Sequence, residues 1–402
     1  MQRLGFLLWL LACGQSLQEN APAASVAASI RQEGGREVVV LQSDTALLEV
    51  IPAEGGVCSR LSVKDGEFAF DLLSNAELLR DVFNHAAMEQ DKPTISFLHQ
   101  INQTAPDSVT LALTAKLDVT NSDESVAGAT LEKQITLHAG KRYFAVRQVL
   151  KNTSGDVLGA SLGTRNRFAL SEVRDTESFL LPTERGILRI VGGGIDNFYA
   201  QMADWEYKPT DGWYGVVNPV KRIGLVFVLD RNLPDAFYTN NLTAVGGWCA
   251  DSGILDPDVV FENAYVVFPL RGFQGVAHAS RRLIADVQVT GTGGTEVTHT
   301  LAGGVAPLGE GSLKTQVEGI TSRKLSTLPD VTMHEVGVDP ATATVALPEP
   351  QQEPIVIRVT ASGNGWQESY ATYFEGNFRQ SIYPGYPYKP QYKREGKSGR
   401  ME

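Results

Sequence analysis

Side chains that could bind a polar ligand are concentrated in two stretches of the sequence. One holds two arginines that flank an asparagine, and the other is rich in tryptophan, tyrosine and aspartate. Guanidinium groups make paired hydrogen bonds to hydroxyl and carboxylate groups, and aromatic rings cover apolar ring faces. This combination is typical of carbohydrate binding. The predicted binding residues are Arg165, Asn166, Arg167, Asp204, Trp205, Asp211, Trp213 and Tyr214.

A structural interpretation of the same residues is the alternative. Trp205 and Trp213 could be core or rim aromatics, and the arginines could pair with nearby acidic residues. His85 fits a loop histidine better than a catalyst. Convergence of Arg165, Asp211 and Trp213 on one concavity would favour the binding interpretation.

Two carboxylates are the candidate catalytic groups if the protein is an enzyme. Asp251 and Glu262 could each act as a general base. The six histidines are scattered, without the paired spacing of metal ligands, and no G-x-S-x-G nucleophile motif is present. The sequence therefore predicts neither a metal site nor a cofactor.

Two cysteines in the body of the chain leave two interpretations open. In an oxidising compartment Cys58 and Cys249 could form one disulfide. They could instead be buried thiols that behave as small apolar groups. The thiol interpretation is preferred, because the long sequence separation gives no indication of proximity.

The elements that would position these residues are predicted to be strands. In residues 129–157, apolar and polar side chains alternate on both sides of a break at 138–141. Gly140 supplies the backbone freedom that a hairpin turn needs. Residues 108–119 alternate as cleanly, which predicts one buried and one wet face. Residues 213–217 and 223–229 form a second predicted hairpin.

These segments resemble the galactose mutarotase-like superfamily. The resemblance rests on three stretches: V-L-K-N-T-S at the end of the first hairpin, a strand–Pro-x-x-Gly-Gly–strand opening at residues 45–63, and G-W-x-G-V in the second hairpin. That superfamily includes aldose 1-epimerases, domains of polysaccharide lyases and hydrolases, and the periplasmic domain of the membrane-protein insertase. The resemblance implies an all-β fold, a large antiparallel supersandwich over residues 36–290.

The resemblance also implies where catalytic groups would lie. Aldose 1-epimerases carry a catalytic histidine in a T-N-H-x-Y-F-N-L motif, and the similar stretch at residues 163–170 has Arg165 at that position. Arginine stays protonated, so it cannot exchange a proton with a sugar. Asp251 takes the place of the family's glutamate. Both departures indicate sugar binding without epimerase activity.

The remaining segments suggest a modular chain. Residues 275–287 give the best helix pattern, with Val276, Ala279, Leu283 and Val287 on one stripe. Short strands over residues 291–365 predict a small immunoglobulin-like β-sandwich. Residues 366–402 are expected to form an aromatic and basic C-terminal arm.

The N-terminus predicts export. Residues 1–13 combine Arg3, a short apolar core and Cys13 in a lipobox-like context, which indicates a signal peptide with Cys13 as the lipidated residue. An ordinary cleaved signal is the alternative. Residues 14–35 would then be a flexible tether. The expected location is the periplasm, the outer membrane as a lipoprotein, or the exterior.

Charge and motifs together narrow the function. The net charge of −11 argues against a nucleic-acid partner. We expect an exported carbohydrate-binding protein whose contact with a membrane is limited to a possible lipid anchor on Cys13. One alternative is an active carbohydrate enzyme, an epimerase or a lyase- or hydrolase-associated domain. The other is a protein-interaction domain of the cell envelope.

Overall fold

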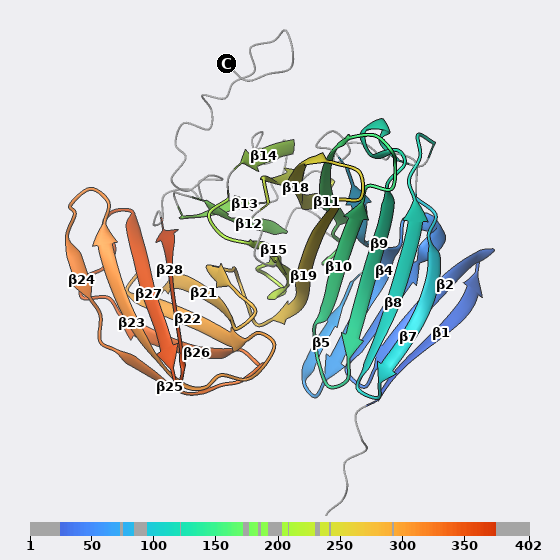
Figure 1. Ribbon diagram of the computed structural model, residues 1–402. Helices are drawn as coiled ribbons and strands as arrows, with labels where there is room; N and C mark the ends of the chain where they lie inside the picture. Colours follow the sequence, from blue (N-terminus) through green and yellow to red (C-terminus); the bar gives the residue numbers. More distant parts are fainter. Residues whose placement is uncertain are drawn as a thin grey trace, which may run out of the picture.

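The structure is a computed structural model, shown in Figure 1. It describes residues 25–72, 75–83, 95–120, 122–171, 177–183, 186–191, 203–207, 209–229, 234–240, 243–291 and 293–374. Within these residues the chain is built from antiparallel strands, with two short 3-10 helices, η1 (Pro52–Glu54) and η3 (Glu124–Val126). The prediction of an all-β fold is confirmed.

The first and larger unit, here called the first sandwich, consists of two sheets that enclose one hydrophobic core. Its ten-stranded sheet runs, in order, through β1 (Val26–Glu33), β2 (Arg36–Ser43), β3 (Ala46–Ile51), β4 (Val57–Asp65), β6 (Glu77–Val82), β11 (Leu158–Arg167), β18 (Val245–Leu255), β17 (Ala236–Asn240) and β14 (Ala203–Tyr207), with β5 (Phe68–Asp71) beside β4.

The facing nine-stranded sheet closes the other side of this core. Its order is β13 (Gly186–Val191), β12 (Ser178–Thr183), β15 (Trp213–Asn218), β16 (Ile223–Leu229), β19 (Val260–Arg271), β10 (Phe144–Lys151), β9 (Thr130–His138), β8 (Ser108–Lys116) and β7 (Leu98–Ala105). Alternate residues of each strand face the core, because successive side chains point to opposite sides of a sheet.

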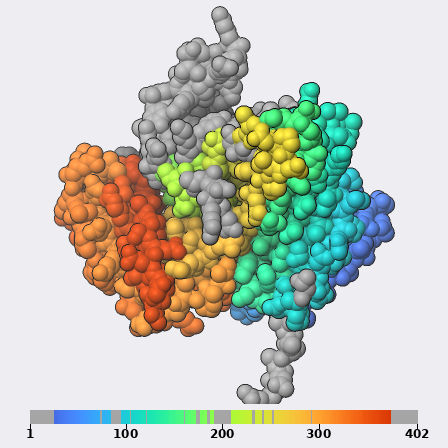
Figure 2. Space-filling model, in the orientation of Figure 1, coloured from blue at the N-terminus to red at the C-terminus, as the bar shows by residue number. Residues whose placement is uncertain are grey.

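The second sandwich is smaller and has its own core. One sheet contains β20 (His278–Ala279), β21 (Leu283–Thr290), β22 (Glu296–Gly303) and β26 (Ala341–Ala346). The other contains β24 (Leu325–Thr327), β23 (Gly309–Gly319), β27 (Ile355–Gly363) and β28 (Trp366–Phe374), with β25 (Val331–Val336) beside β23. Figure 2 shows this unit, orange to red, packed beside the first sandwich.

A third apolar cluster, the junction, joins the two units. Strands β15, β16 and β19 supply Trp213, Val226 and Phe268, and β21 supplies Ile284. The junction is tight at Gly272, whose φ of +88° suits glycine and where a Cβ would lie 2.7 Å from Pro340. The two sandwiches therefore form one packed body.

The predicted central hairpin is confirmed. Strands β9 and β10 pair in register from Phe144 opposite Leu137 to Lys151 opposite Thr130. The turn contains Gly140 at φ +65°, and its backbone N–H donates to Asp44 Oδ1 at 2.7 Å. The same sheet contains the second predicted hairpin as β15 and β16.

Three boundary predictions and one helix prediction are wrong. The tether of residues 14–35 does not hold for Val26–Glu33, which forms β1 and pairs with β2. The expected arm from residue 366 begins with a strand, β28, paired with β27. The 290/291 division cuts through the second sandwich, because β21 pairs with β22. Finally, the helix predicted at 275–287 is extended chain, with β20 and β21 in it.

Candidate functional site

Strand β11 carries the arginines that the sequence singled out, and its alternation decides where they point. Leu162 belongs to the core, and Thr164 Oγ1 lies 3.3 Å from both Gln148 Nε2 and Tyr265 OH of the opposite sheet. Arg165 and Arg167 occupy the alternate positions, so they lie on the side of the sheet that faces away from the core.

The register of the neighbouring strands extends this side across the sheet. Arg165 lies opposite Arg80 of β6 and opposite Gly247 of β18. Gly247 in turn lies opposite Tyr238 of β17. Arg80, Arg165 and Tyr238 therefore share one transverse row. We call this side of the ten-stranded sheet the outer face; its described residues are Glu77, Arg80, Val82, Arg165, Arg167, Tyr238, Asn240, Val245 and Cys249.

A β-bulge in β6 shapes the outer face. Arg80 pairs with Arg165 and Glu77 pairs with Arg167, so β6 has one more residue than β11 between these two pairs. A bulge of this kind re-aims the side chains on either side of it. Here it brings Glu77 and Arg80 to the same side, and the carboxylate of Glu77 accepts a hydrogen bond from Arg80 Nε.

Buried polar groups hold the bulge in place. Leu79 has φ +68°, a left-handed conformation that costs a non-glycine residue about 1–2 kcal/mol. Its N–H donates to Asn166 Oδ1 at 2.8 Å, and its carbonyl accepts from Lys133 Nζ at 2.7 Å. Asn166, predicted to bind ligand, is thus a fully buried support for β6 and does not face a ligand.

Lys133 is itself part of a buried ion pair. Its Nζ lies 2.7 Å from Asp81 Oδ2, and both side chains are fully buried between the two sheets. Burial raises the pKa of Asp81 and lowers the pKa of Lys133, while their mutual attraction opposes both shifts. Lys133 also donates to the carbonyls of Gly55 and Gly56 at 3.2 and 3.3 Å. Lys133 therefore connects β9 to β6 and to the turn that precedes β4.

Exposure separates the groups a ligand can reach from those beneath them. The side chains of Glu77 and Arg80 are each 20% exposed, and Arg167 is half-buried, whereas Arg165 is only 5% exposed. Tyr238, Val82, Val245 and Cys249 form a buried apolar cluster on the same face. The groups that a ligand can reach form a polar patch of hydrogen-bond donors and one carboxylate, and the apolar side chains of the same face are buried.

The two cysteines described are free thiols, as preferred from the sequence. Burial raises the pKa of Cys58 and of Cys249 to about 12. Neither is therefore a thiolate near neutral pH, although Cys249 lies on the outer face.

The predicted aromatic binding residues of β15 are elsewhere. Trp213 is buried in the junction, on the outward side of the nine-stranded sheet. Tyr214 lies inside the first sandwich, in contact with the rings of Phe168, Phe237 and Trp248. The predicted convergence of Arg165 and Trp213 is wrong, because the two lie on opposite sides of the first sandwich.

Two predicted carboxylates are also away from Arg165. Asp211 Oδ2 lies 3.8 Å from His278 Nδ1 of the second sandwich. Glu262, a predicted base, is on the exposed side of the nine-stranded sheet, in a two-bond ion pair with Arg147 at 2.6 and 2.7 Å. The hydrogen bonds from Arg147 lower the pKa of Glu262. Neither carboxylate can act with Arg165.

The remaining predicted residues are placed only in part. Trp205 lies opposite Tyr238 in backbone register, and Asp204 precedes it on β14. Asp251 lies on β18 opposite Ser161. The side chains of these three residues are outside the described part of the structure, as are Cys13 and His85 altogether.

Sequence reasoning missed Arg80, Glu77 and Tyr238. The consecutive leucines Leu78 and Leu79 interrupt the alternation in the sequence of β6, so this segment lacks the pattern of a half-buried strand. A carboxylate followed three residues later by an arginine is the signal that was available. The register that aligns them with Arg165 could not be read from the sequence.

Metal binding has no support in the described residues, where no group of three or more His, Cys, Asp or Glu could hold an ion. Across the same residues, no helix has the length and apolar character to cross a membrane.

Comparison with known proteins gives structural neighbours alone. No family model matches the sequence, and no curated protein matches it. Solved structures similar to this chain include a galactose mutarotase-like protein from Clostridium acetobutylicum, with 7% identity, a TM-score of 0.41, and 61% of this chain and 99% of that chain covered. Another is galactose 1-epimerase from Lactobacillus acidophilus, with 11% identity, a TM-score of 0.39, and 62% and 99% covered.

A third similar structure is a TPR-domain containing protein from Parabacteroides distasonis, with 12% identity and a TM-score of 0.45 over 58% of this chain. The match spans 47% of that protein's length. The structural neighbours include galactose mutarotase-like proteins, the group that the sequence resembles. At these scores and identities the likeness does not bear on activity.

Proposed function

We propose that the outer face binds a carbohydrate and that the protein has no epimerase activity. The observation that carries this proposal is the patch formed by Glu77 and Arg80 on the β6 bulge and by Arg167, which lies opposite Glu77 on β11. Planar guanidinium groups and a carboxylate pair with neighbouring sugar hydroxyls through two hydrogen bonds at once.

The surroundings of the patch support this proposal. Arg165 lies directly opposite Arg80, so a further guanidinium group lies next to the patch. The bulge is held by buried hydrogen bonds, so little ordering free energy is needed on binding.

The described groups of the outer face support the absence of epimerase activity, because its exposed carboxylate, Glu77, is occupied by a hydrogen bond from Arg80. Mutarotation needs an acid and a base that exchange protons near neutral pH. Arginine remains charged, and burial keeps the Cys249 thiol protonated. Glu262 is on the opposite sheet.

A glycan array of neutral and acidic oligosaccharides, followed by calorimetry on the best ligand, tests binding. Arg80→Gln and Arg167→Gln are expected to weaken that binding at least about tenfold, because each loses charge-assisted hydrogen bonds. Arg147→Gln is the matched control on the opposite sheet and should bind normally. A silent array, or an equal loss in Arg147→Gln, would contradict the proposal.

Anomer exchange of glucose and galactose, followed by NMR, tests the second part. We expect the uncatalysed rate. Catalysis that disappears in Asp251→Ala would establish the enzyme alternative instead. Envelope proteins recovered in pull-downs beside a silent array would favour the protein-interaction alternative.

We also propose that the chain is exported and anchored through Cys13, as residues 1–13 indicate. A single lipidated cysteine would hold it on a membrane surface. In a bacterial host, wild type should then sediment with membranes and Cys13→Ser should not. Identical fractionation of the two would refute the anchor.

A further inference from the structure

A cavity of about 240 Å³ lies between the two sandwiches. The first sandwich supplies the β4–β5 hairpin, the β9–β10 turn and the end of β19. The second supplies β21, the end of β22 and the loops near Val305 and Pro340. The cavity exists only because the two units pack together, and domain interfaces are common places for small-molecule sites.

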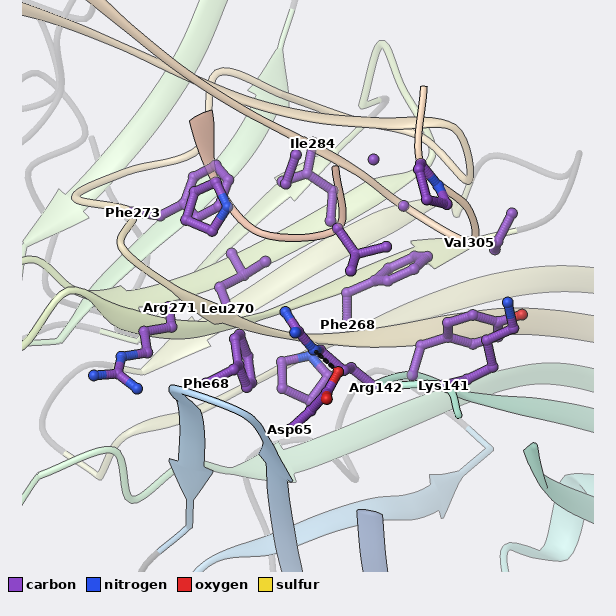
Figure 3. A pocket seen from close by; sticks show the side chains of 18 of the residues that line it. Asp65, Phe68, Lys141, Arg142, Phe268, Leu270, Arg271, Phe273, Ile284 and Val305 are labelled. Carbon is purple, nitrogen blue, oxygen red and sulfur yellow. Dashed lines mark hydrogen bonds and ion pairs between the residues drawn. The ribbon is translucent and has the colours of Figure 1, made fainter. Parts of the chain in front are cut away.

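Most of the cavity wall is apolar, and its side chains are held in place by packing. Phe268, Leu270, Phe273 and Ile284 belong to the junction cluster and are almost completely buried. Figure 3 shows these side chains around the cavity, with Phe68 on the opposite side. The ring of Tyr143 lies 5.5 Å from that of Phe268. Such walls suit a flat apolar ring.

The charged residues that line the cavity are mostly cationic. They are Lys141, Arg142 and Arg271 against one carboxylate, Asp65, in a chain whose net charge is −11. Arg271 is engaged with the backbone carbonyl of Glu67. Lys141, in the β9–β10 turn, makes no ion pair with any described residue.

Arg142 is a largely buried polar group in the wall of the cavity. Its side chain is 13% exposed, and the guanidinium lies 4.5 Å from the centre of the Phe68 ring. Nε donates to Asp65 Oδ2 at 2.8 Å and Nη1 to Asp339 Oδ1 at 2.6 Å. Its Nη2 makes no hydrogen bond to a described residue, and Figure 3 shows the guanidinium at the edge of the cavity.

We propose that this cavity binds a small ring compound that carries one carboxylate. An apolar cavity of about 150 Å³ accepts benzene, so the volume here accommodates a ring with a short acidic side chain. The ring would pack among Phe68, Phe268 and Ile284. The carboxylate would accept a hydrogen bond from Arg142 Nη2 and would also be attracted by the charge of Lys141. This site is separate from the outer face and does not depend on its function.

Three ligands of one shape test the proposal on the full chain: 3-phenylpropionate, 3-phenylpropanol and 3-phenylpropylamine. Binding is measured by saturation-transfer NMR and calorimetry. The carboxylate should bind more tightly than the alcohol, and the amine should bind most weakly. Equal binding of all three, or no binding of the carboxylate at millimolar concentration, would overturn the proposal.

Two variants locate the site. Val305→Trp fills the mouth from a half-buried loop position and should abolish binding, whereas its thermal unfolding should stay close to that of wild type. Lys141→Gln should weaken carboxylate binding about fivefold and leave alcohol binding unchanged. Lys151→Gln, an exposed lysine outside the cavity, is the matched control and should bind as wild type. Carboxylate binding that survives Val305→Trp would place the ligand elsewhere and refute the site.

Discussion

His299 is a buried base between the two sheets of the second sandwich. The side chain is fully buried, and its Nε2 lies 3.1 Å from Thr315 Oγ1. Burial lowers the pKa of His299 to about 4, because the charged form loses its hydration there. The folded protein therefore keeps this ring neutral under conditions in which an unfolded chain would protonate it.

This shift predicts acid sensitivity. Between pH 6.5 and 4 the unfolded chain binds a proton at His299 and the folded chain does not, so stability falls as the pH falls through this window. The loss should reach about 3 kcal/mol. The free energy of unfolding, measured with urea at several pH values in this window, should depend less steeply on pH in His299→Gln than in wild type.

His334→Gln, which changes an exposed histidine of the same sandwich, is the control. Its free energy of unfolding should depend on pH as steeply as that of wild type. Parallel curves for wild type and His299→Gln would show that His299 does not cause the acid sensitivity.

The sequence indicated which residue types could bind a ligand better than it indicated which side of a sheet each side chain faces. Arg165 and Arg167 lie on the outer face, whereas Trp213 and Tyr214, which were chosen on the same chemical grounds, do not. A strand shows its alternation in the sequence but not which of its two sides is covered. Trp213 faces outward and is still buried, because the second sandwich packs over it.

The β6 bulge is the element that assembles the candidate site. It depends on Asn166, whose Oδ1 accepts from the Leu79 N–H and which has no contact with solvent. Asn166 is accordingly a positioning residue. Its side chain fixes the strand that presents Glu77 and Arg80.

Asn166→Ala should destabilise the protein by about 1–3 kcal/mol, because the Leu79 N–H loses its partner inside the sandwich. It should also weaken glycan binding, although Asn166 cannot touch the ligand. Asn263→Ala is the matched control: Asn263 is a buried asparagine that donates to Gln148 Oε1 at 2.9 Å on the opposite sheet. Denaturation and calorimetry of both variants should show comparable destabilisation and a binding defect in Asn166→Ala alone. Equal binding by the two variants would remove the positioning role.

Clear alternation identified the strands that have one wet side, whereas β21, which is buried on both sides, was mistaken for part of a helix. Residues 129–157 alternate because β9 and β10 have one face in the core and one at the surface. In β21, Leu283 and Ala285 face the second core while Ile284 faces the junction. This gives a continuous apolar run that, with Val276 and Ala279, matches a helical stripe by chance.

The junction makes the two sandwiches one cooperative unit. Trp213, Phe268 and Ile284 share a cluster, and Arg142 ties Asp65 of the first unit to Asp339 of the second. Neither unit can unfold without exposing the apolar surface of the other. This coupling could not be predicted from the sequence, which suggested separable modules.

Scanning calorimetry should therefore give one transition with equal calorimetric and van't Hoff enthalpies. Phe273→Ala, which opens a cavity in the junction, should cost about 3–5 kcal/mol and lower the single midpoint. Two resolved transitions in the wild type would contradict the cooperative unit.

Because β21 contributes to two cores, the chain has no clean cleavage point near residue 290. Limited proteolysis there would separate β22 from its partner strand β21 and expose Ile284 and Ala302 to water. Both products would tend to self-associate through these newly bared surfaces, so an intact chain is the smallest well-behaved form for biophysical work.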